Sequence, residues 1–111
     1  MEESILVSIK KLLGISKECT DFDTDIIIHI NTVFRILNQM GVGPEEGFRI
    51  EDSDTTWSEY IQDNKKLDDI ITYIYLKVKL IFDPPLNGTV INANKQMIDE
   101  LEWRLNFQSE S

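Results

Sequence analysis

A long helical pattern that runs into two consecutive prolines constrains the fold of this chain more than any other feature. Between residues 67 and 85, apolar residues recur every three or four positions, which places them on one side of an α-helix. The residues of this face are Leu67, Ile70, Ile71, Ile74, Val78 and Phe82. Pro84 and Pro85 then disfavour helical backbone at the residues that precede them. The pattern therefore predicts a core helix over residues 67–82 that stops at the prolines.

The start of the chain predicts a shorter helix. One face of residues 3–13 carries the apolar side chains Ile5, Ile9, Leu12 and Leu13. Lys10 and Lys11 are expected to point away from that face. Ser4 is a candidate N-cap, and Gly14 stands where a C-terminal cap glycine is expected.

A second helix is expected over residues 21–40. Aspartate and threonine side chains at 21–24 supply cap oxygens and negative charge for its first turn. Its core face is formed by Ile26, Ile27, Ile30, Val33, Phe34 and Leu37. Gly41, Gly43 and Pro44 end it.

Acidic residues concentrate in the middle of the chain, where residues 45–69 hold nine acids and three bases. Residues 44–56 are predicted to form a loop. A short helix is expected over residues 57–62, because Thr56 and Glu59 stand in the spacing of a capping box. The core helix would then be capped near Asn64 or Lys65.

The last helix is expected over about residues 89–107, after a turn at 86–89. Its apolar face is predicted to contain Val90, Ala93, Met97, Ile98, Leu101 and Leu105. The whole chain, residues 1–111, is thus predicted to be a single all-α domain, a small bundle of four main helices and one short helix. The double proline would separate the body from a last helix that acts as a partner-facing arm.

Composition excludes several classes of protein. The net charge of −9 opposes DNA binding, which depends on lysine and arginine at the phosphates. The chain contains no apolar run of 18 residues, so a membrane span is not expected. The start Met1-Glu2-Glu3-Ser4 lacks the basic segment of a secretory signal. Cys19 is the one cysteine, so no internal disulfide is expected, which fits a reducing cytosol.

No residue pattern predicts an enzyme, a metal site or a cofactor. His29 is the one histidine, and Asp25 one turn earlier does not by itself complete a catalytic or metal site. The acids of residues 45–54 lack the ligand spacing of an EF-hand loop. The glycines of residues 41–43 follow a helix rather than a strand, so they do not form a phosphate-binding motif.

Two sets of residues are candidates for contacts with other molecules. Aromatic and basic side chains form the candidate partner interface, which contains Trp57, Tyr60, Lys77, Lys79, Trp103 and Phe107. The four aromatic residues have an alternative role as cover for the core. The acidic loop, with Glu45, Glu46, Glu51, Asp52 and Asp54, is the candidate lining of a channel or contact with a neighbour.

Three segments of the chain resemble the head–tail connector (adaptor) proteins of tailed bacteriophages. Residues 4–15, which end in Lys10-Lys11-Leu12-Leu13-Gly14-Ile15, are similar to the start of that family, and residues 72–85 are similar to its penultimate helix. Lys77 and Lys79 stand where the family usually has a double arginine, and Asp-Pro-Pro replaces a Gly/Ser-rich loop. Residues 97–106 resemble the versions found in phages and prophages of Gram-positive bacteria.

This resemblance implies a structural protein of the virion that assembles in the host cytoplasm. Such a protein forms a ring of about twelve copies under the portal protein, extends the DNA channel and docks the next neck or tail protein. DNA would pass through the ring without specific binding, since acids that line a channel repel phosphates. The Trp103–Phe107 end is the candidate portal contact. The alternative is a small acidic helical regulator, antitoxin-like or a DNA-mimic inhibitor, that binds a protein partner.

Overall fold

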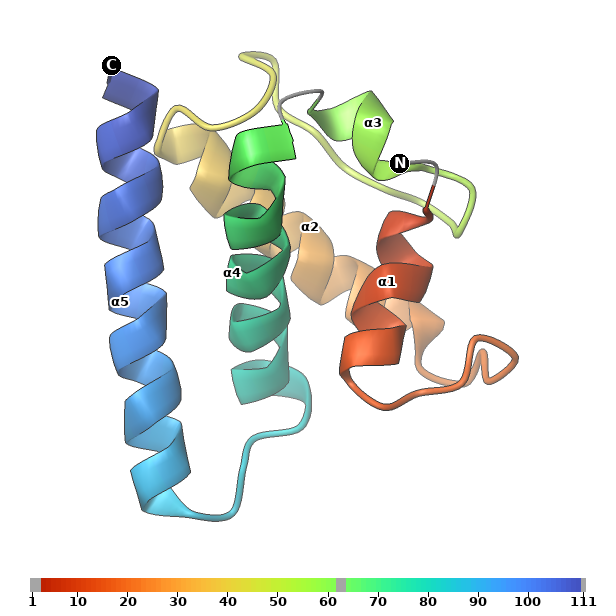
Figure 1. Ribbon diagram of the computed structural model, residues 1–111. Helices are drawn as coiled ribbons and strands as arrows, with labels where there is room; N and C mark the ends of the chain where they lie inside the picture. The colour runs from red at the N-terminus through yellow and green to blue at the C-terminus, as the bar shows by residue number, and fades with distance from the viewer. Residues whose placement is uncertain (1–2, 62–63, 111) are drawn as a thin grey trace.

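The computed structural model describes residues 3–61 and 64–110, and their side chains up to residue 61 and over 66–106. Its helices are α1 (Ile5–Leu12), α2 (Asp23–Gln39), α3 (Trp57–Tyr60), α4 (Asn64–Phe82) and α5 (Gly88–Glu110) (Figure 1). No strand forms within the described ranges. The predicted all-α class, with four main helices and a short one, is confirmed. The cap that was predicted near Asn64 or Lys65 falls on side chains outside the described set.

α4 is the central helix of the bundle and packs against α1, α2 and α5. In Figure 1, α5 runs antiparallel beside α4 on one side, and α2 crosses behind α4. The predicted stop is confirmed, because α4 ends at Phe82 and the two prolines follow at once. Asn87 then caps α5, since its Oδ1 accepts the N–H of Thr89 at 2.7 Å.

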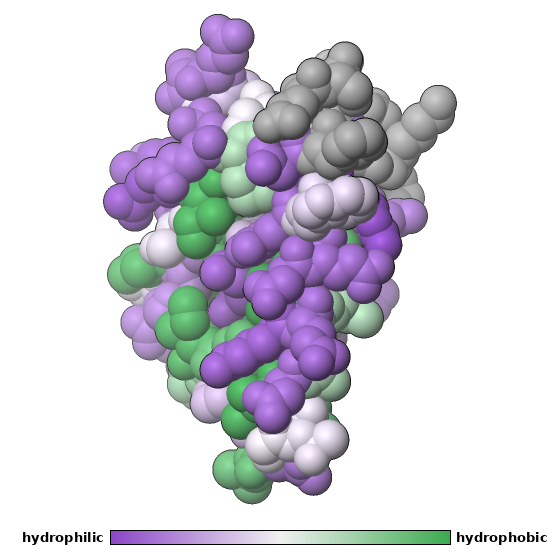
Figure 2. Space-filling view, turned by 90° about the vertical axis from the view of Figure 1, so that its left-hand side faces the viewer, coloured by the Kyte–Doolittle hydropathy of each residue, from purple (hydrophilic) through white to green (hydrophobic). Residues whose placement is uncertain are grey.

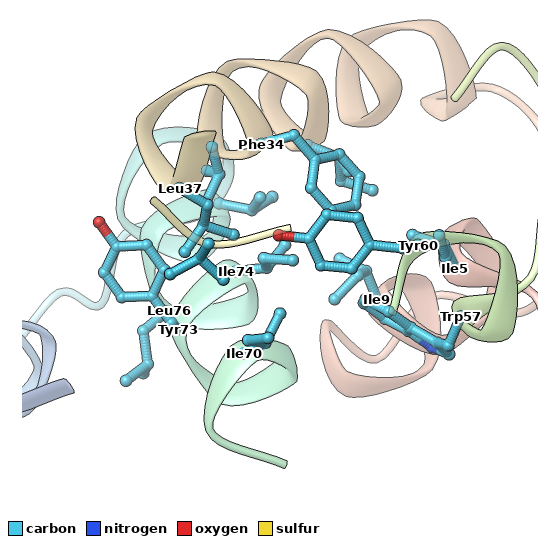
Figure 3. Close-up of a cluster of buried hydrophobic side chains, with 14 of the residues drawn as sticks. Ile5, Ile9, Phe34, Leu37, Trp57, Tyr60, Ile70, Tyr73, Ile74 and Leu76 are labelled. Atoms are coloured by element: carbon cyan, nitrogen blue, oxygen red, sulfur yellow. The ribbon is translucent and has the colours of Figure 1, made fainter. Parts of the chain in front are cut away.

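More residues of α4 are buried in the core than those of the predicted apolar face. Leu67, Ile70, Ile74 and Val78 are buried as expected, whereas Ile71 and Phe82 are partly buried. Tyr73 and Leu76 are buried as well. Figure 3 shows Tyr73 and Leu76 on the side of α4 nearer α5, and Ile70 and Ile74 nearer the other helices. α4 is therefore buried on two sides, which a single periodic face does not predict.

The prediction that Lys10 points away from the core is wrong. Its side chain is 2% exposed, and its Nζ donates to the backbone oxygens of Cys19 at 2.6 Å and Lys17 at 3.3 Å. The same Nζ lies 2.8 Å from Asp23 Oδ1. The two carbonyls accept hydrogen bonds and the carboxylate supplies the opposite charge, so the ammonium can be buried and ties the 13–22 loop to α1. Leu12, which was expected in the core, is exposed instead.

Helix ends follow the predicted cap residues in most cases. Ser4 Oγ accepts the N–H of Val7 at 3.2 Å, and Gly14 follows the end of α1 with a φ of 81°. Gly41 has the same role after α2, with a φ of 82°. The predicted cap of α2 is wrong, because its N-cap residue is Phe22 and makes no side-chain cap bond. Asp23 pairs with Lys10 instead.

The buried face of α5 differs from the predicted one. Ile98, Leu101 and Leu105 are buried, as expected, but Val90 and Met97 are 44% and 50% exposed. The packing face is thus rotated away from those two residues. α5 is not a detached arm, since its buried residues belong to the same core cluster as those of α2 and α4. Only the outer face of α5 remains available to a partner.

Side-chain and backbone contacts hold the long 44–56 loop on the bundle. The Asn31 amide donates to the Ile50 carbonyl at 2.9 Å and accepts the Ile50 N–H at 2.8 Å. Farther along, the N–H of Ile5 donates to the Thr55 carbonyl at 3.0 Å. The predicted short helix is confirmed as α3, with the Glu59 carboxylate accepting the N–H of Thr56 at 2.8 Å.

We expect Gly43→Ala to destabilise the protein more than Gly47→Ala does. Both glycines have a positive φ, 87° and 89°, so both substitutions strain the backbone. A Cβ at Gly43 would also lie 2.7 Å from the Tyr60 ring, whereas a Cβ at Gly47 meets nothing within 4 Å. This overlap should add about 1–3 kcal/mol to the loss of unfolding free energy, measured by urea denaturation. Equal losses for the two variants would contradict the close approach of Gly43 to Tyr60.

Candidate interaction surfaces

The aromatic residues of α3 are part of the core. Trp57 and Tyr60 are 1% and 4% exposed. The indole N–H of Trp57 donates to Ser8 Oγ at 3.0 Å, and the Tyr60 ring packs on Phe34 and Phe48 at centroid distances of 4.6 and 5.0 Å. Figure 3 shows both side chains directed into the bundle. Trp57 and Tyr60 therefore have the alternative role of covering the core, and we no longer include them in the candidate partner interface.

Lys77 and Lys79 lie near acids of their own chain. Lys77 Nζ is 3.9 Å from Glu102 Oε2 on α5 and lies 5.9 Å from the centre of the Tyr73 ring. Lys79 Nζ is 3.7 Å from Asp83 Oδ2. Both ion pairs are partly exposed, so each contributes little to stability. Either lysine could therefore pair with an acid of a partner instead.

A polar network joins α4 to α5. The Tyr73 hydroxyl donates to Glu102 Oε2 at 2.8 Å. Burial, followed by the hydrogen bond and the charge of Glu102, raises the pKa of the Tyr73 phenol. Arg104 donates to Asp69 Oδ1 at 3.2 Å and to Glu100 Oε1 at 2.9 Å. The bonds of Tyr73 to Glu102 and of Arg104 to Asp69 join the two helices and favour the rotation of α5 that leaves Trp103 on its outer face.

Trp103 lies on the outer face of α5 and is 68% exposed. Helical spacing places Asp99 and Glu100 one turn before it on the same side, and both are exposed. An indole with this exposure is typical of an interface anchor. Phe107, the other aromatic candidate in α5, belongs to the helix, but its side chain lies outside the described set.

The acidic loop is divided into two groups by the buried residue Ile50. Glu45 and Glu46 are exposed in the turn that follows α2. Glu51, Asp52 and Asp54 are exposed in the part that approaches the start of α1 and α3, where Ser4 and Thr56 form a β-bridge. The five acids thus form two clusters at different positions and do not cover one face of the molecule. A DNA mimic would require regularly spaced carboxylates over such a face.

Two arginines border an open hollow of about 560 Å³ between α2 and the 46–49 segment. We name it the arginine hollow. Its lining includes Ile28, Asn31, Arg35, Glu46, Phe48 and Arg49. Ile28 is 56% exposed and supplies an apolar wall. The sequence pattern did not single out this site, because Arg35 and Arg49 stand 14 positions apart in the chain. Their segments come together only in the fold, through the clamp of Asn31 on Ile50 and the packing of Phe48 on Phe34.

Exposed hydrophobic side chains gather at one end of the bundle. We name this the apolar end, and it contains Leu12, Phe22, Ile81, Leu86 and Val90. These residues lie where α1 and α4 finish and where α2 and α5 begin, at the lower end of Figure 1. Figure 2 also shows hydrophobic residues exposed at the lower end and along the left side, beside a broad hydrophilic band. Gathered apolar side chains of this kind mark interaction sites.

Within the described part of the chain, no three His, Cys, Asp or Glu side chains are placed to share a metal ion. No described helix has the length and apolar character that a membrane crossing requires.

Comparison with known protein families identifies the family to which the chain belongs. A family model described as phage connector protein matches residues 5–111. The chain belongs to the phage connector protein family. The resemblance to phage head–tail connectors is confirmed, whereas a Gram-positive host stays a prediction. The chain is a structural connector of the phage particle that interacts with other head or tail proteins. No curated protein and no solved structure matches it.

We expect Tyr73→Phe and Tyr60→Phe to have opposite effects on the stability of this connector. The Tyr73 hydroxyl is bonded to Glu102, so its removal should cost about 1 kcal/mol of unfolding free energy. The Tyr60 hydroxyl is buried without a hydrogen-bond partner among the described residues, so its removal should be neutral or stabilising. Urea denaturation of both variants gives the comparison. A loss for Tyr60→Phe as large as that for Tyr73→Phe would show that the hydroxyl of Tyr60 has a partner.

Alkaline pH should destabilise the connector through these two tyrosines. Burial raises the pKa of both phenols in the folded state, whereas a tyrosine in the unfolded chain ionises at about pH 10. The stabilisation is complete below that pH and is lost as the pH rises above it, because the unfolded chain releases its protons first. Thermal unfolding between pH 8 and 11 should show a falling midpoint, with a smaller fall in Tyr60→Phe. A midpoint that is constant over this range would contradict the burial of both phenols.

Proposed function

We propose that this connector assembles as a ring under the portal protein, extends the DNA channel and docks the next neck or tail protein. The family match supports the general role, and the apolar end is the observation that carries the docking function. Five exposed hydrophobic side chains from four separate parts of the chain lie at helix ends on that side of the bundle, which favours burial against another protein.

The apolar end is the axial contact surface of the proposed ring. Its residues lie at helix ends, so a partner can contact them without changing the packing around α4. Leu86 is fully exposed in the loop between α4 and α5, and Val90 belongs to the first turn of α5. This end replaces the Trp103–Phe107 segment as our candidate for the contact with the portal.

The acidic clusters have a different role in the proposed ring. Glu45, Glu46, Glu51, Asp52 and Asp54 are exposed carboxylates on loops. Carboxylates that face the channel repel DNA phosphates, so the DNA slides past without binding. The net charge of −9 agrees with a surface that must not retain nucleic acid.

Leu86→Asp should abolish the docking of the connector while leaving its fold intact. An aspartate at this exposed position introduces a charge into a contact that has to exclude water, so binding should weaken by about tenfold or more. The measurement is electron microscopy of phage heads assembled with the variant, scored for connector density and for joined tails.

Asn87→Asp is the matched control for this experiment. It adds the same charge at the next residue, keeps the cap oxygen for Thr89 and removes no apolar surface. Heads with Asn87→Asp should carry the connector and join tails as the wild type does. If heads with Leu86→Asp also carry the connector and join tails normally, the apolar end is not the docking surface.

A further inference from the structure

The arginine hollow carries two arginines that form no ion pair with the described residues. Between residues 21 and 63 of this acidic protein, Arg35 and Arg49 are the only lysine or arginine residues, and both border the hollow. Lys10, Lys77, Lys79 and Arg104 all pair with carboxylates of the same chain. Among the described residues, neither Arg35 nor Arg49 has such a partner within 4.0 Å.

The walls of the arginine hollow suit an aromatic side chain that is accompanied by acids. Ile28 is 56% exposed and Phe48 is half-buried, so the hollow offers apolar surface between two guanidinium groups. Guanidinium groups stack on aromatic rings and bind carboxylates with two parallel hydrogen bonds. Glu46 also lines the hollow, but two arginines leave it with net positive charge.

The outer face of α5 is complementary to this hollow. Trp103 is 68% exposed there, and Asp99 and Glu100 precede it by one turn. The Glu100 carboxylate already pairs with Arg104, whereas Asp99 has no ion-pair partner within 4.0 Å among the described residues. This face thus combines an exposed indole with negative charge, which is what the hollow requires.

We propose that Trp103 of one copy enters the arginine hollow of the next copy, where Asp99 and Glu100 approach Arg35 and Arg49. Within one chain the two surfaces cannot meet, because α4 packs between α2 and α5 and both surfaces face away from it. The contact is therefore head-to-tail. Such a contact repeats from copy to copy and closes into a ring when the rotation allows. This inference rests on the proposed ring and names the surfaces that form it.

Charge reversal tests the pairing. In the first variant, Arg35→Glu is combined with Arg49→Glu, so that the hollow repels the acidic face of α5. In the second, Gln96→Arg is combined with Asp99→Arg, which gives the exposed face of α5 a positive charge. Glu100 is left unchanged because of its bond to Arg104. All four positions are exposed, and thermal unfolding should confirm that both variants fold.

Each variant alone should assemble poorly. We expect the concentration for half-maximal ring formation to rise by about tenfold or more, measured by sedimentation and by electron microscopy of portal-bearing heads. An equimolar mixture of the two variants should restore rings, because each provides the surface that the other has lost. A chain with all four substitutions should restore them too. Lys11→Glu with Lys17→Glu is the control for the first variant, since it also replaces two positive charges with negative ones, at exposed positions on another part of the molecule.

The outcomes separate this inference from the proposed function. If the wild type forms no ring in solution or on heads, the proposed ring fails and this contact fails with it. If rings form with the wild type and equally with Arg35→Glu/Arg49→Glu, only the contact is overturned. Rings that are lost in the first variant but not restored by the mixture or the four-fold variant would exclude α5 as the occupant. Loss of head attachment with intact rings would assign the hollow to another virion protein and overturn the inference.

Discussion

The burial of α4 on two sides is the constraint on which the other surfaces depend. Ile70 and Ile74 face the helices on one side, while Tyr73 and Leu76 face α5 on the other. A central helix that is covered on both sides leaves the outer faces of its neighbours exposed. This arrangement directs the outer faces of α2 and α5 away from each other. It also places the ends of α1 and α4 and the starts of α2 and α5 at the apolar end. The surfaces available for assembly thus result from how the core is filled.

Strong helical periodicity explains why the sequence predicted α2 and α4 well. Their faces are rich in Ile and Val, which are only moderate helix formers, so regular apolar spacing there indicates burial. The stop after α4 was predictable because proline acts on local backbone alone. The second buried side of α4 was not predictable from one face, since Tyr73 and Leu76 gain their burial from α5.

Interactions between distant residues account for the predictions that failed. Lys10 was assigned to the surface by its charge, but its carboxylate partner, Asp23, lies 13 positions later and comes close only in the folded chain. The same reason hid the arginine hollow, which forms only when contacts such as those of Asn31 and Phe34 hold the 46–49 segment near α2. For α5, polar residues interrupt the apolar pattern, so the spacing allowed two neighbouring faces. Contacts with α4 then selected the one with Ile98.

Electrostatics decide how copies with a net charge of −9 could associate side by side. Repulsion between exposed carboxylates that are farther apart than about 8 Å is largely screened at physiological ionic strength, whereas charges in direct contact are screened much less. A local pairing of Asp99 with Arg35 or Arg49 can therefore outweigh the repulsion between the remaining surfaces. The proposed lateral contact involves few residues, and the proposed axial contact at the apolar end is separate from it. In the proposed assembly, binding of several copies to one symmetric portal would raise their effective concentration beside each other, so a weak lateral contact would suffice once the axial contact had formed. The division of the two surfaces between a charged side and an apolar end thus favours assembly at the portal over assembly in free solution.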